Sequence, residues 1–249
     1  MKPLKVLICS IFRDSEKNIP KYYSQLINLV QNTEDVSFYY SAYENDSVDN
    51  TYSTLVSKDF SSFIDYSIQT ETLCTQKFGS TTDSERVINL SNARNKAIFS
   101  RNFYLDCDYL LFIESDIEYN SNILNNMLSF ALEHDADIVS PACIASGSRD
   151  LVCRDIWATR RHSSEEWGKF FSGCSHKKYD TYYSTFGSFC LYKMKPFIVD
   201  KITWSAFNTR LNKYDCDTAV ICEQFHELGM SRIFVLYDNI VKHYKRGFA

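Results

Sequence analysis

The chain has 249 residues, enough for one large α/β domain, and 45% hydrophobic with 23% charged residues is a globular rather than a disordered composition. A formal net charge of −4 argues against a nucleic-acid partner, because proteins that follow a phosphate backbone are normally basic. No segment approaches the roughly 20 apolar residues of a membrane span, and the N-terminus lacks the features of a signal peptide, so we expect a cytoplasmic protein.

The first half of the chain alternates between strand-like and helix-like segments. The apolar run Lys5–Ser10 predicts a buried strand, and Pro20 begins a helix at a position where its missing N–H costs nothing. The aromatic segment Val36–Tyr43 predicts a second strand, which a polar loop follows. Further along we expect helices at Thr51–Lys58 and Glu85–Arg101, and strands at Glu71–Phe78 and Tyr109–Ile113.

The second half is less regular. We expect helices at Asn122–His134 and Asp217–Leu228, strands at Ile138–Pro141, Phe186–Lys193 and Arg232–Tyr237, and a substrate-facing insertion at Ser146–Tyr182. Alternating strands and helices predict a single α/β domain over residues 1–249, with a mainly parallel sheet and helices on both faces. Ligands of such sheets bind at the carboxyl ends of the strands, so the polar loops there are the candidate sites.

The nine cysteines include no Cys-x-x-Cys pair, and most lie in apolar surroundings, as Cys9 and Cys190 do. Zinc sites need closely spaced cysteine or histidine ligands. We therefore expect buried, reduced thiols in a reducing compartment and no zinc site.

An acidic turn follows the predicted strand Tyr109–Ile113 directly, with Glu114 and Asp116 on alternate positions. Alternate residues of an extended segment share one face, so both carboxylates would point into a site at the end of this strand. Such oxygen ligands suit Mg²⁺ or Mn²⁺ held jointly with substrate phosphates. A solvated acidic turn would have the same sequence.

Two other polar segments are candidate binding sites. In Tyr43–Thr51, Glu44 or Asp46 would contact a nucleoside, although Asp49 or Asn50 could simply cap the next helix. In Ser91–Ala97, Arg94 would face a diphosphate or the carboxylates of the acidic turn, although a salt bridge within the helix is the alternative.

Taken together, these segments resemble the GT-A glycosyltransferase fold, and most of all the fungal capsule-associated α-1,3-mannosyltransferase family. The motifs that carry the resemblance are Ser10–Asp14, Tyr43–Thr51, Ala93–Asn95 and the acidic turn, with looser likeness at Asp155–Arg160 and Phe186–Phe189. Asp217, Gly229, Ile233–Tyr237 and His243 follow the GT-A order of acid, glycine, strand and histidine. The chain departs from the pattern at two points. It has Glu-Ser-Asp where the pattern has Asp-x-Asp, and it has Asp-Thr where the pattern has Glu-Asp.

The resemblance implies a metal-dependent transfer of sugar from a nucleoside-diphosphate sugar to a glycan, a glycoconjugate or another hydroxyl acceptor. Residues 1–120 would bind the donor and residues 121–249 would face the acceptor. The implied donor-binding residues are Ser10, Phe12, Arg13, Glu44, Asp46, Arg94, Asn95 and Glu114, and the implied ligands of Mn²⁺ or Mg²⁺ are Asp116, Glu114 and His243. The implied acceptor-binding residues are Asp155, Trp157, Arg160, Phe186 and Gly187, with Trp204 as a further stacking candidate. Asp217 would be the catalytic base, with Asp215 as the alternative.

Other functions stay open at this point. A nucleotidyltransferase would also join a carboxylate pair to a nucleotide, but it should carry a glycine-rich basic loop near the first strand, and Ser10–Ser15 has no glycine. A non-catalytic nucleotide-sugar or glycan-binding module is compatible with the altered acidic pair. Dinucleotide-binding and P-loop fingerprints do not occur. Further domains or partner glycosyltransferases are compatible with the sequence.

Overall fold

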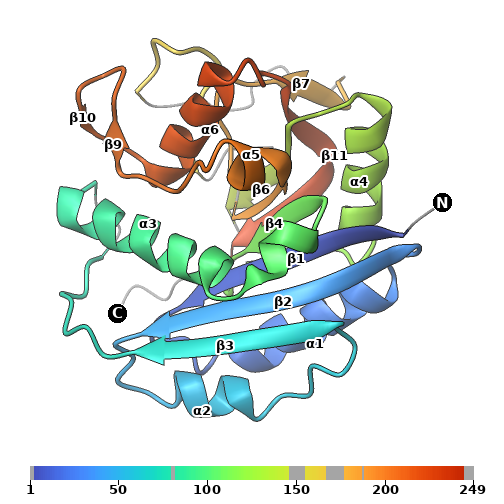
Figure 1. The fold of residues 1–249 in the computed structure, drawn as a ribbon, viewed down its shortest axis with the longest axis vertical. Helices are drawn as coiled ribbons and strands as arrows, with labels where there is room; N and C mark the ends of the chain where they lie inside the picture. Colours follow the sequence, from blue (N-terminus) through green and yellow to red (C-terminus); the bar gives the residue numbers. More distant parts are fainter. Residues whose placement is uncertain (1–2, 80–81, 146–154, 167–176, 187, 244–249) are drawn as a thin grey trace.

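The computed structural model describes residues 3–79, 82–145, 155–166, 177–186 and 188–243 (Figure 1). Their framework is a nine-stranded sheet together with a separate two-stranded hairpin. In chain order, the elements are β1 (Leu4–Phe12), α1 (Ile19–Gln31), β2 (Val36–Asn45), α2 (Thr51–Val56), β3 (Asp65–Glu71), α3 (Ser84–Phe99), the 3₁₀ helix η1 (Asn102–Asp106), β4 (Tyr109–Ile113), β5 (Ile117–Glu118), α4 (Ile123–Glu133), β6 (Ile138–Ala145), β7 (Tyr179–Thr181), β8 (Phe189–Lys193), α5 (Lys195–Val199), β9 (Phe207–Asn208), β10 (Lys213–Tyr214), α6 (Asp217–Glu227) and β11 (Ile233–His243).

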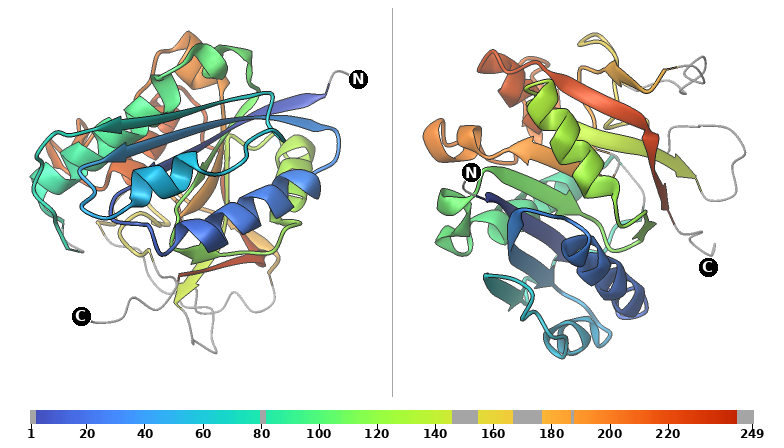
Figure 2. Two further views of the ribbon diagram at one scale, coloured as in Figure 1. Left: turned by 90° about the horizontal axis from the view of Figure 1, so that it is seen from below. Right: turned by 90° about the vertical axis from the view of Figure 1, so that its right-hand side faces the viewer.

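The large sheet has the strand order β3-β2-β1-β4-β8-β6-β11-β5, and β7 also pairs with β11. Strands β3, β2, β1 and β4 are parallel neighbours, and so are β6 and β11. Strand β8 runs antiparallel between β4 and β6, and it joins these two parallel groups into one sheet. The predicted α/β domain with a mainly parallel sheet and helices on both faces is confirmed (Figures 1 and 2).

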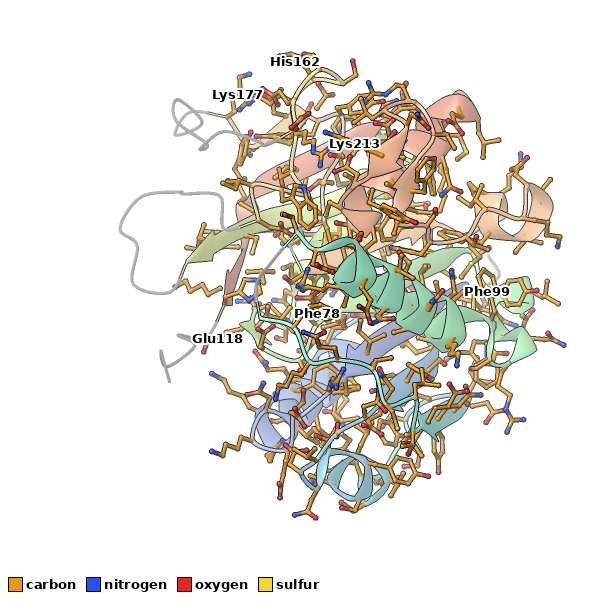
Figure 3. The ribbon with its side chains drawn as sticks, turned by 90° about the vertical axis from the view of Figure 1, so that its left-hand side faces the viewer. Phe78, Phe99, Glu118, His162, Lys177 and Lys213 are labelled. Carbon is orange, nitrogen blue, oxygen red and sulfur yellow. The ribbon has the colours of Figure 1, made fainter. Side chains whose placement is uncertain are left out.

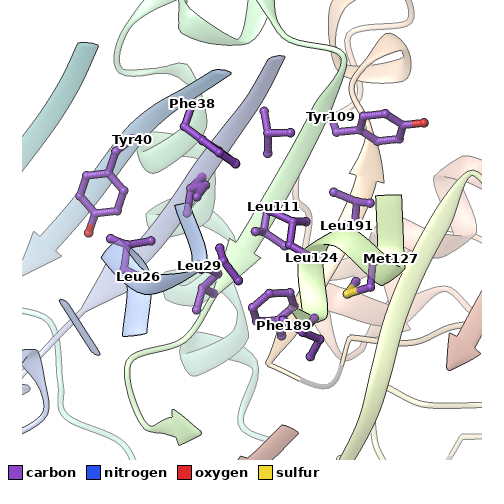
Figure 4. Packing of buried hydrophobic residues seen from close by; sticks show 14 of the residues in the cluster. Leu26, Leu29, Phe38, Tyr40, Tyr109, Leu111, Leu124, Met127, Phe189 and Leu191 are labelled. Atoms are coloured by element: carbon purple, nitrogen blue, oxygen red, sulfur yellow. The ribbon is translucent and has the colours of Figure 1, made fainter. Parts of the chain in front are cut away.

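Alternation along the central strands creates a separate apolar core on each face of the sheet. On one face, Val6 and Ile8 of β1 and Leu111 of β4 pack with residues of α1 and α4, as Figure 4 shows for Leu26 and Leu124. The second core, which includes Leu7, Cys9, Leu110 and Phe112, lies against α3, α5 and α6. These central strands are buried on both faces, as expected of strands that helices cover on either side.

Most elements match the sequence prediction, but the third strand does not. It spans Asp65–Glu71 instead of Glu71–Phe78. The chain leaves the extended conformation just after β3, because Asp46 accepts the backbone N–H groups of Leu73, Cys74 and Thr75 and Cys74 has a φ of 56°. The residues of this segment are β-prone, and only the tertiary contact with Asp46 decides their conformation.

The carboxyl ends of β1, β2 and β3 lie at one edge of the sheet, which Figure 3 faces. In this view Phe78, at the end of the segment after β3, lies between Glu118 of β5 and Phe99 at the end of α3. Across the described residues, no helix is both long and apolar enough to cross a membrane. None of the seven described cysteines forms a disulfide, and six of them are buried.

Candidate active site at the carboxyl ends of the strands

The acidic turn after β4 places its two carboxylates against different partners. The backbone N–H of Glu114 donates to the carbonyl of Ser188 at 2.9 Å, and this bond fixes the start of the turn. The Glu114 carboxylate then lies 3.4 Å from Arg94, whereas Asp116 lies beside His243. The two side chains therefore have different neighbours, which the simple alternation argument did not predict.

Asp116 and His243 meet because of a strand pairing that the sequence did not reveal. The short strand β5 runs antiparallel to the end of β11, and Ile117 is the partner of His243 in this ladder. Asp116 immediately precedes Ile117, and its Oδ1 lies 3.5 Å from Nδ1 of His243. Both side chains are mostly buried.

The Asp116–His243 pair fits a divalent cation. Two ligands about 2.1 Å from an octahedral ion are about 3 Å apart when adjacent and about 4 Å apart when opposite, so a separation of 3.5 Å is compatible with joint binding. Carboxylate and imidazole are both accepted by Mn²⁺-like ions, and Mg²⁺ sites at substrates are completed by phosphate oxygens and water. No group of three or more His, Cys, Asp or Glu side chains with metal-site geometry occurs among the described residues.

Arg94 of α3 is the central cation of the site. Its Nε donates to Asp217 at 2.7 Å, its Nη2 lies 3.4 Å from Glu114, and only 3% of the residue is exposed. The guanidinium stacks between the rings of Phe112 and Phe186, at 4.7 and 4.5 Å from their centroids. Burial alone would lower the pKa of Arg94, but the charges of Asp217 and Glu114 outweigh burial and raise it. The salt bridges of Arg94 thus reach Glu114 of the acidic turn and Asp217, and neither partner lies in the same helix as Arg94.

Two further carboxylates belong to this cluster. Asp217 begins α6, where the helix dipole favours a negative charge, and only 3% of it is exposed. Asp155 accepts the N–H of Ala158 at 3.3 Å. Burial and the nearby charge of Glu114 raise the pKa of Asp155 above its usual value of 3.8, and the charge of Asp217 acts in the same direction.

A surface pocket of about 460 Å³ lies at the carboxyl ends of β1, β2 and β3. Its lining includes Arg13, Glu44 and Asp46, all three predicted from the sequence to contact a donor. Glu44 is almost fully buried and accepts the N–H of Ser47 at 2.9 Å and the hydroxyl of Thr70. This volume lies within the usual range of small-molecule sites.

Arg13 and Asp46 also hold the segment that follows β3. Arg13 donates through Nη2 to the carbonyl of Thr75 at 2.8 Å and through Nη1 to the Thr75 hydroxyl at 3.0 Å. Asp46 accepts the backbone N–H groups of Leu73, Cys74 and Thr75 at 2.6–3.0 Å. Part of the hydrogen-bonding capacity of both side chains is therefore used to shape the pocket wall.

Three residues that were expected to contact the donor are instead part of the framework. The hydroxyl of Ser10 is fully buried, where it donates to the carbonyl of Ile113 at 2.7 Å, and Phe12 packs in the core. The side-chain amide of Asn95 forms two 2.8 Å hydrogen bonds with the backbone of Trp204. Strand alternation turns Ser10 and Phe12 towards the α1 face, so their side chains belong to the framework.

Several expected acceptor-side residues are also structural. Arg160 is 1% exposed and forms a bidentate pair with Asp215 at 2.9 and 2.7 Å. This pair occupies both oxygens of the Asp215 carboxylate, whereas Arg94 bonds only one oxygen of Asp217, so Arg160 and Asp215 have a structural role in place of the expected acceptor and base roles. Phe186 and Trp204 are buried, at 2% exposure each, so neither can stack on an acceptor sugar. Trp157 is half-buried, and Gly187 lies outside the described residues.

Ser188 is a residue of this site whose role the sequence did not reveal. Besides accepting the N–H of Glu114, it forms a 2.8 Å hydrogen bond between its Oγ and Nε2 of His243. Its φ of 62° is uncommon for a residue with a side chain. No local pattern around Ser188 signals this long-range contact, because His243 comes from the last strand.

The sequence matches neither a protein-family model nor a curated protein. Solved structures do share its fold. S. aureus TarS 1–349 in complex with UDP-GlcNAc superimposes with a TM-score of 0.58 at 16% identity, over 99% of this chain and 60% of that one. The mannosyltransferase PcManGT from Pyrobaculum calidifontis, in complex with GDP-Man and Mn²⁺, gives a TM-score of 0.60 at 11% identity, over 100% of this chain and 59% of that one.

These similarities establish a GT-A-type α/β fold for the chain, as the sequence predicted. The chain spans about three fifths of the length of TarS 1–349 and of PcManGT. Identities of 11–16% do not transfer an activity, so the function has to rest on the side chains of this chain.

Proposed function

We propose that this chain is a metal-dependent glycosyltransferase domain that uses a nucleoside-diphosphate sugar. One observation carries the proposal: a pocket of about 460 Å³ over β1–β3 lies at the same edge of a GT-A-type sheet as the acidic turn after β4, where Asp116 faces His243. A nucleoside in the pocket and a diphosphate at the acidic turn would together span this edge. Solved structures of this fold hold UDP-GlcNAc or GDP-Man.

The pocket residues would recognise the nucleoside. Glu44 is the best placed of them, because it lines the pocket and its carboxylate is oriented by Ser47 and Thr70. A carboxylate fixed in this way can accept the N–H groups of a nucleobase or the hydroxyl groups of a ribose. Arg13 and Asp46 would act mainly by fixing the wall formed by Leu73, Cys74 and Thr75.

Asp116 and His243 would hold Mn²⁺ or Mg²⁺. Bound there, the ion would neutralise the charge that grows on the departing diphosphate. Glu114 is turned towards Arg94, so we propose that it orients Arg94 or contacts the donor and does not bind the ion directly.

Asp217 and Asp155 would face the acceptor. In an inverting transfer, the acceptor oxygen bonds to the anomeric carbon, the bond from this carbon to the diphosphate breaks, and a carboxylate takes the hydroxyl proton. Asp217 is the proposed base, and Arg94 would fix the orientation of its carboxylate. The opposite stereochemical outcome would leave Asp217 as an acceptor-orienting group.

Finer parts of the proposal rest on motifs alone. The resemblance to fungal capsule-associated α-1,3-mannosyltransferases is carried by Tyr43–Thr51 and Ala93–Asn95, and it favours a glycan acceptor. Cysteines without disulfides, as the described ones are, are compatible with the proposed cytoplasmic location. We also propose further domains or partner glycosyltransferases, because the chain spans only about three fifths of TarS 1–349 and of PcManGT.

Replacing Asp116 with Asn tests the metal-dependent donor site. Calorimetry of UDP and GDP should detect binding to the wild type with Mn²⁺ and little binding with EDTA. Asp116→Asn should bind at least tenfold more weakly and keep a wild-type circular dichroism spectrum, because an amide is a poor ligand for a hard cation. A nucleotide affinity that changes neither with EDTA nor with the substitution would rule out the proposed site.

A non-catalytic nucleotide-sugar-binding module is the second candidate. The observation in its favour is the burial of Asp217, whose carboxylate is already paired with Arg94. Release of nucleoside diphosphate from UDP-GlcNAc or GDP-mannose, with water as the acceptor, separates the two functions. An enzyme should show slow, Mn²⁺-dependent release, whereas a module that binds the donor should show none.

A further inference from the structure

Ser188 contacts both segments that form the proposed metal site, the acidic turn after β4 and the end of β11. Its backbone carbonyl accepts the N–H of Glu114 at 2.9 Å, at the start of the acidic turn. Its hydroxyl lies 2.8 Å from Nε2 of His243, in the last residue of β11. Only 2% of Ser188 is exposed, so water does not compete freely for either bond.

The imidazole of His243 therefore has a different neighbour at each nitrogen. Nε2 faces the Ser188 hydroxyl, and Nδ1 faces Oδ1 of Asp116 at 3.5 Å. A neutral imidazole carries one proton, and the nitrogen that lacks it is the only one that can bind a cation. The partner of Nε2 thus determines whether Nδ1 is available on the Asp116 side.

We propose that Ser188 is a positioning residue for the metal, because it accepts the Nε2–H of His243 and leaves the lone pair of Nδ1 directed at the site beside Asp116. This inference rests on the proposed function. Groups that hold the second nitrogen of a metal-binding histidine fix its ring and its tautomer. Ser188 would also keep the Glu114 end of the turn in register with β11.

The backbone of Ser188 makes the role separable from folding. A φ of 62° is a conformation that glycine adopts without the steric cost of a Cβ atom. Ser188→Gly should therefore fold and unfold at a temperature no lower than about that of the wild type, while it removes the hydroxyl. If Ser188 had only a structural role, Ser188→Gly would have no further effect.

The first test reads the tautomer with Mg²⁺ and UDP or GDP present, because without a cation the carboxylate of Asp116 would itself favour a proton on Nδ1. Long-range ¹H–¹⁵N spectra at about pH 8, above the usual histidine pKa of about 6.5, distinguish protonated from unprotonated ring nitrogens. His243 should be found as the Nε2–H tautomer in the wild type and as a mixture in Ser188→Gly, with His243→Gln identifying its signals among the five histidines. An Nδ1–H tautomer in the wild type would overturn the inference, because Ser188 would then be the donor.

The second test measures Mn²⁺ binding directly, from the electron paramagnetic resonance signal of the free ion with UDP or GDP present. Ser188→Gly should weaken Mn²⁺ binding by about 10–100-fold, as loss of such a supporting contact commonly does. Unchanged affinity in Ser188→Gly would overturn the inference and leave the proposed metal site intact. No Mn²⁺ binding by the wild type would overturn both.

Ser184 provides the matched control. It is also a fully buried serine, and its hydroxyl donates to the carbonyl of Ala158 at 2.6 Å, away from His243. Ser184→Ala should lower the unfolding temperature, because a buried acceptor loses its donor, but it should bind Mn²⁺ within about twofold of the wild type. An equal loss of Mn²⁺ affinity in Ser184→Ala would mean that general loosening, and not Ser188, sets the affinity.

Discussion

Arg94 joins carboxylates that come from opposite halves of the chain. It contacts Glu114 after β4 and Asp217 at the start of α6, and two aromatic rings enclose its guanidinium. A buried cation of this kind is costly unless its charge is compensated, so each carboxylate depends on Arg94 and Arg94 depends on them. The relative position of the acidic turn and α6 is thereby fixed at the level of single side chains.

Asp217→Asn tests the base assigned to the acceptor side. We expect turnover to fall by about 10²–10⁴, because an amide cannot take the acceptor proton, while the affinity for donor stays near the wild-type value. Stability should fall by about 1.5–3 kcal/mol, since Arg94 loses a charged partner. Rates of sugar transfer, or of donor hydrolysis, are measured below the unfolding temperature of the variant.

The control is Asp215→Asn, which changes another buried aspartate of the same segment. Asp215 is paired with Arg160, so this variant should lose similar stability but little activity. Near-wild-type turnover in Asp217→Asn, or an equal loss in Asp215→Asn, would reject Asp217 as the base.

For single residues, the sequence suggested a candidate site but not the contacts within it. The types and order of Asp116, His243 and Arg94 suggested a site only in combination, because a solvated turn or a salt bridge within a helix would explain each of them alone. The roles expected for Ser10 and Arg160 were wrong, because strand alternation and a buried ion pair turned them into framework. Such pairings between distant segments leave no local signal in the sequence.

The segment after β3 is an element without regular structure, and Asp46 holds it in place. Desolvation alone would raise the pKa of Asp46, but hydrogen bonds from Thr75, Asn45 and Cys74 outweigh it and keep that pKa well below 3.8. The stabilisation from this carboxylate is present above pH 3.8, the unfolded value, and is lost as the pH falls further towards the lowered native pKa.

Asp46→Asn should therefore destabilise the protein less in acid than near neutral pH. Its unfolding temperature should lie below that of the wild type at pH 6–7, and the difference should shrink below about pH 4, where the Asp46 carboxylate of the unfolded state takes up a proton. Asp238→Asn, which makes the same change of charge at an exposed position of β11, should show no such trend. A difference that stays constant down to pH 3 would contradict the role given to Asp46.

Elements with strong periodicity or a buried apolar run were predictable, as α1, β4 and α6 show. Strand β3 was misplaced because it is a half-exposed strand at the end of the sheet, where hydrophobic alternation is weak. The two-residue strands β5, β9 and β10 are too short to carry any period, and β5 is the strand that brings Asp116 to His243.

In the whole molecule, the halves proposed to face the donor and the acceptor share one sheet. Strand β4 from the first half pairs with β8 from the second, and α3 contacts α6 across the boundary. The division at residue 120 is thus one of proposed function within a continuous core. We expect the described part of the chain to unfold as a single cooperative unit.

The variant Leu26→Ala tests whether the two halves of the chain unfold together. Leu26 is fully buried in α1, so its truncation should cost about 2–5 kcal/mol, or about 2–4 °C in unfolding temperature for each kcal/mol. All three tryptophans follow residue 120, so their fluorescence reports on the other half. In Leu26→Ala, the unfolding transitions followed by fluorescence and by circular dichroism should shift together. Leu132→Ala, at an exposed position of α4, should shift neither transition. A fluorescence transition that stays in place would mean that the halves unfold separately.

The antiparallel strand β8 has a consequence for how the protein is made. It fills the gap between β4 and β6, yet the chain reaches it only after α4, β6 and β7. On the ribosome, β4 must therefore wait with one backbone edge unpaired until residues 189–193 emerge, and such an edge can recruit strands from other nascent chains. The middle of the sheet closes late, and the segment that closes it begins directly after Ser188, so folding is completed at the border of the proposed metal site.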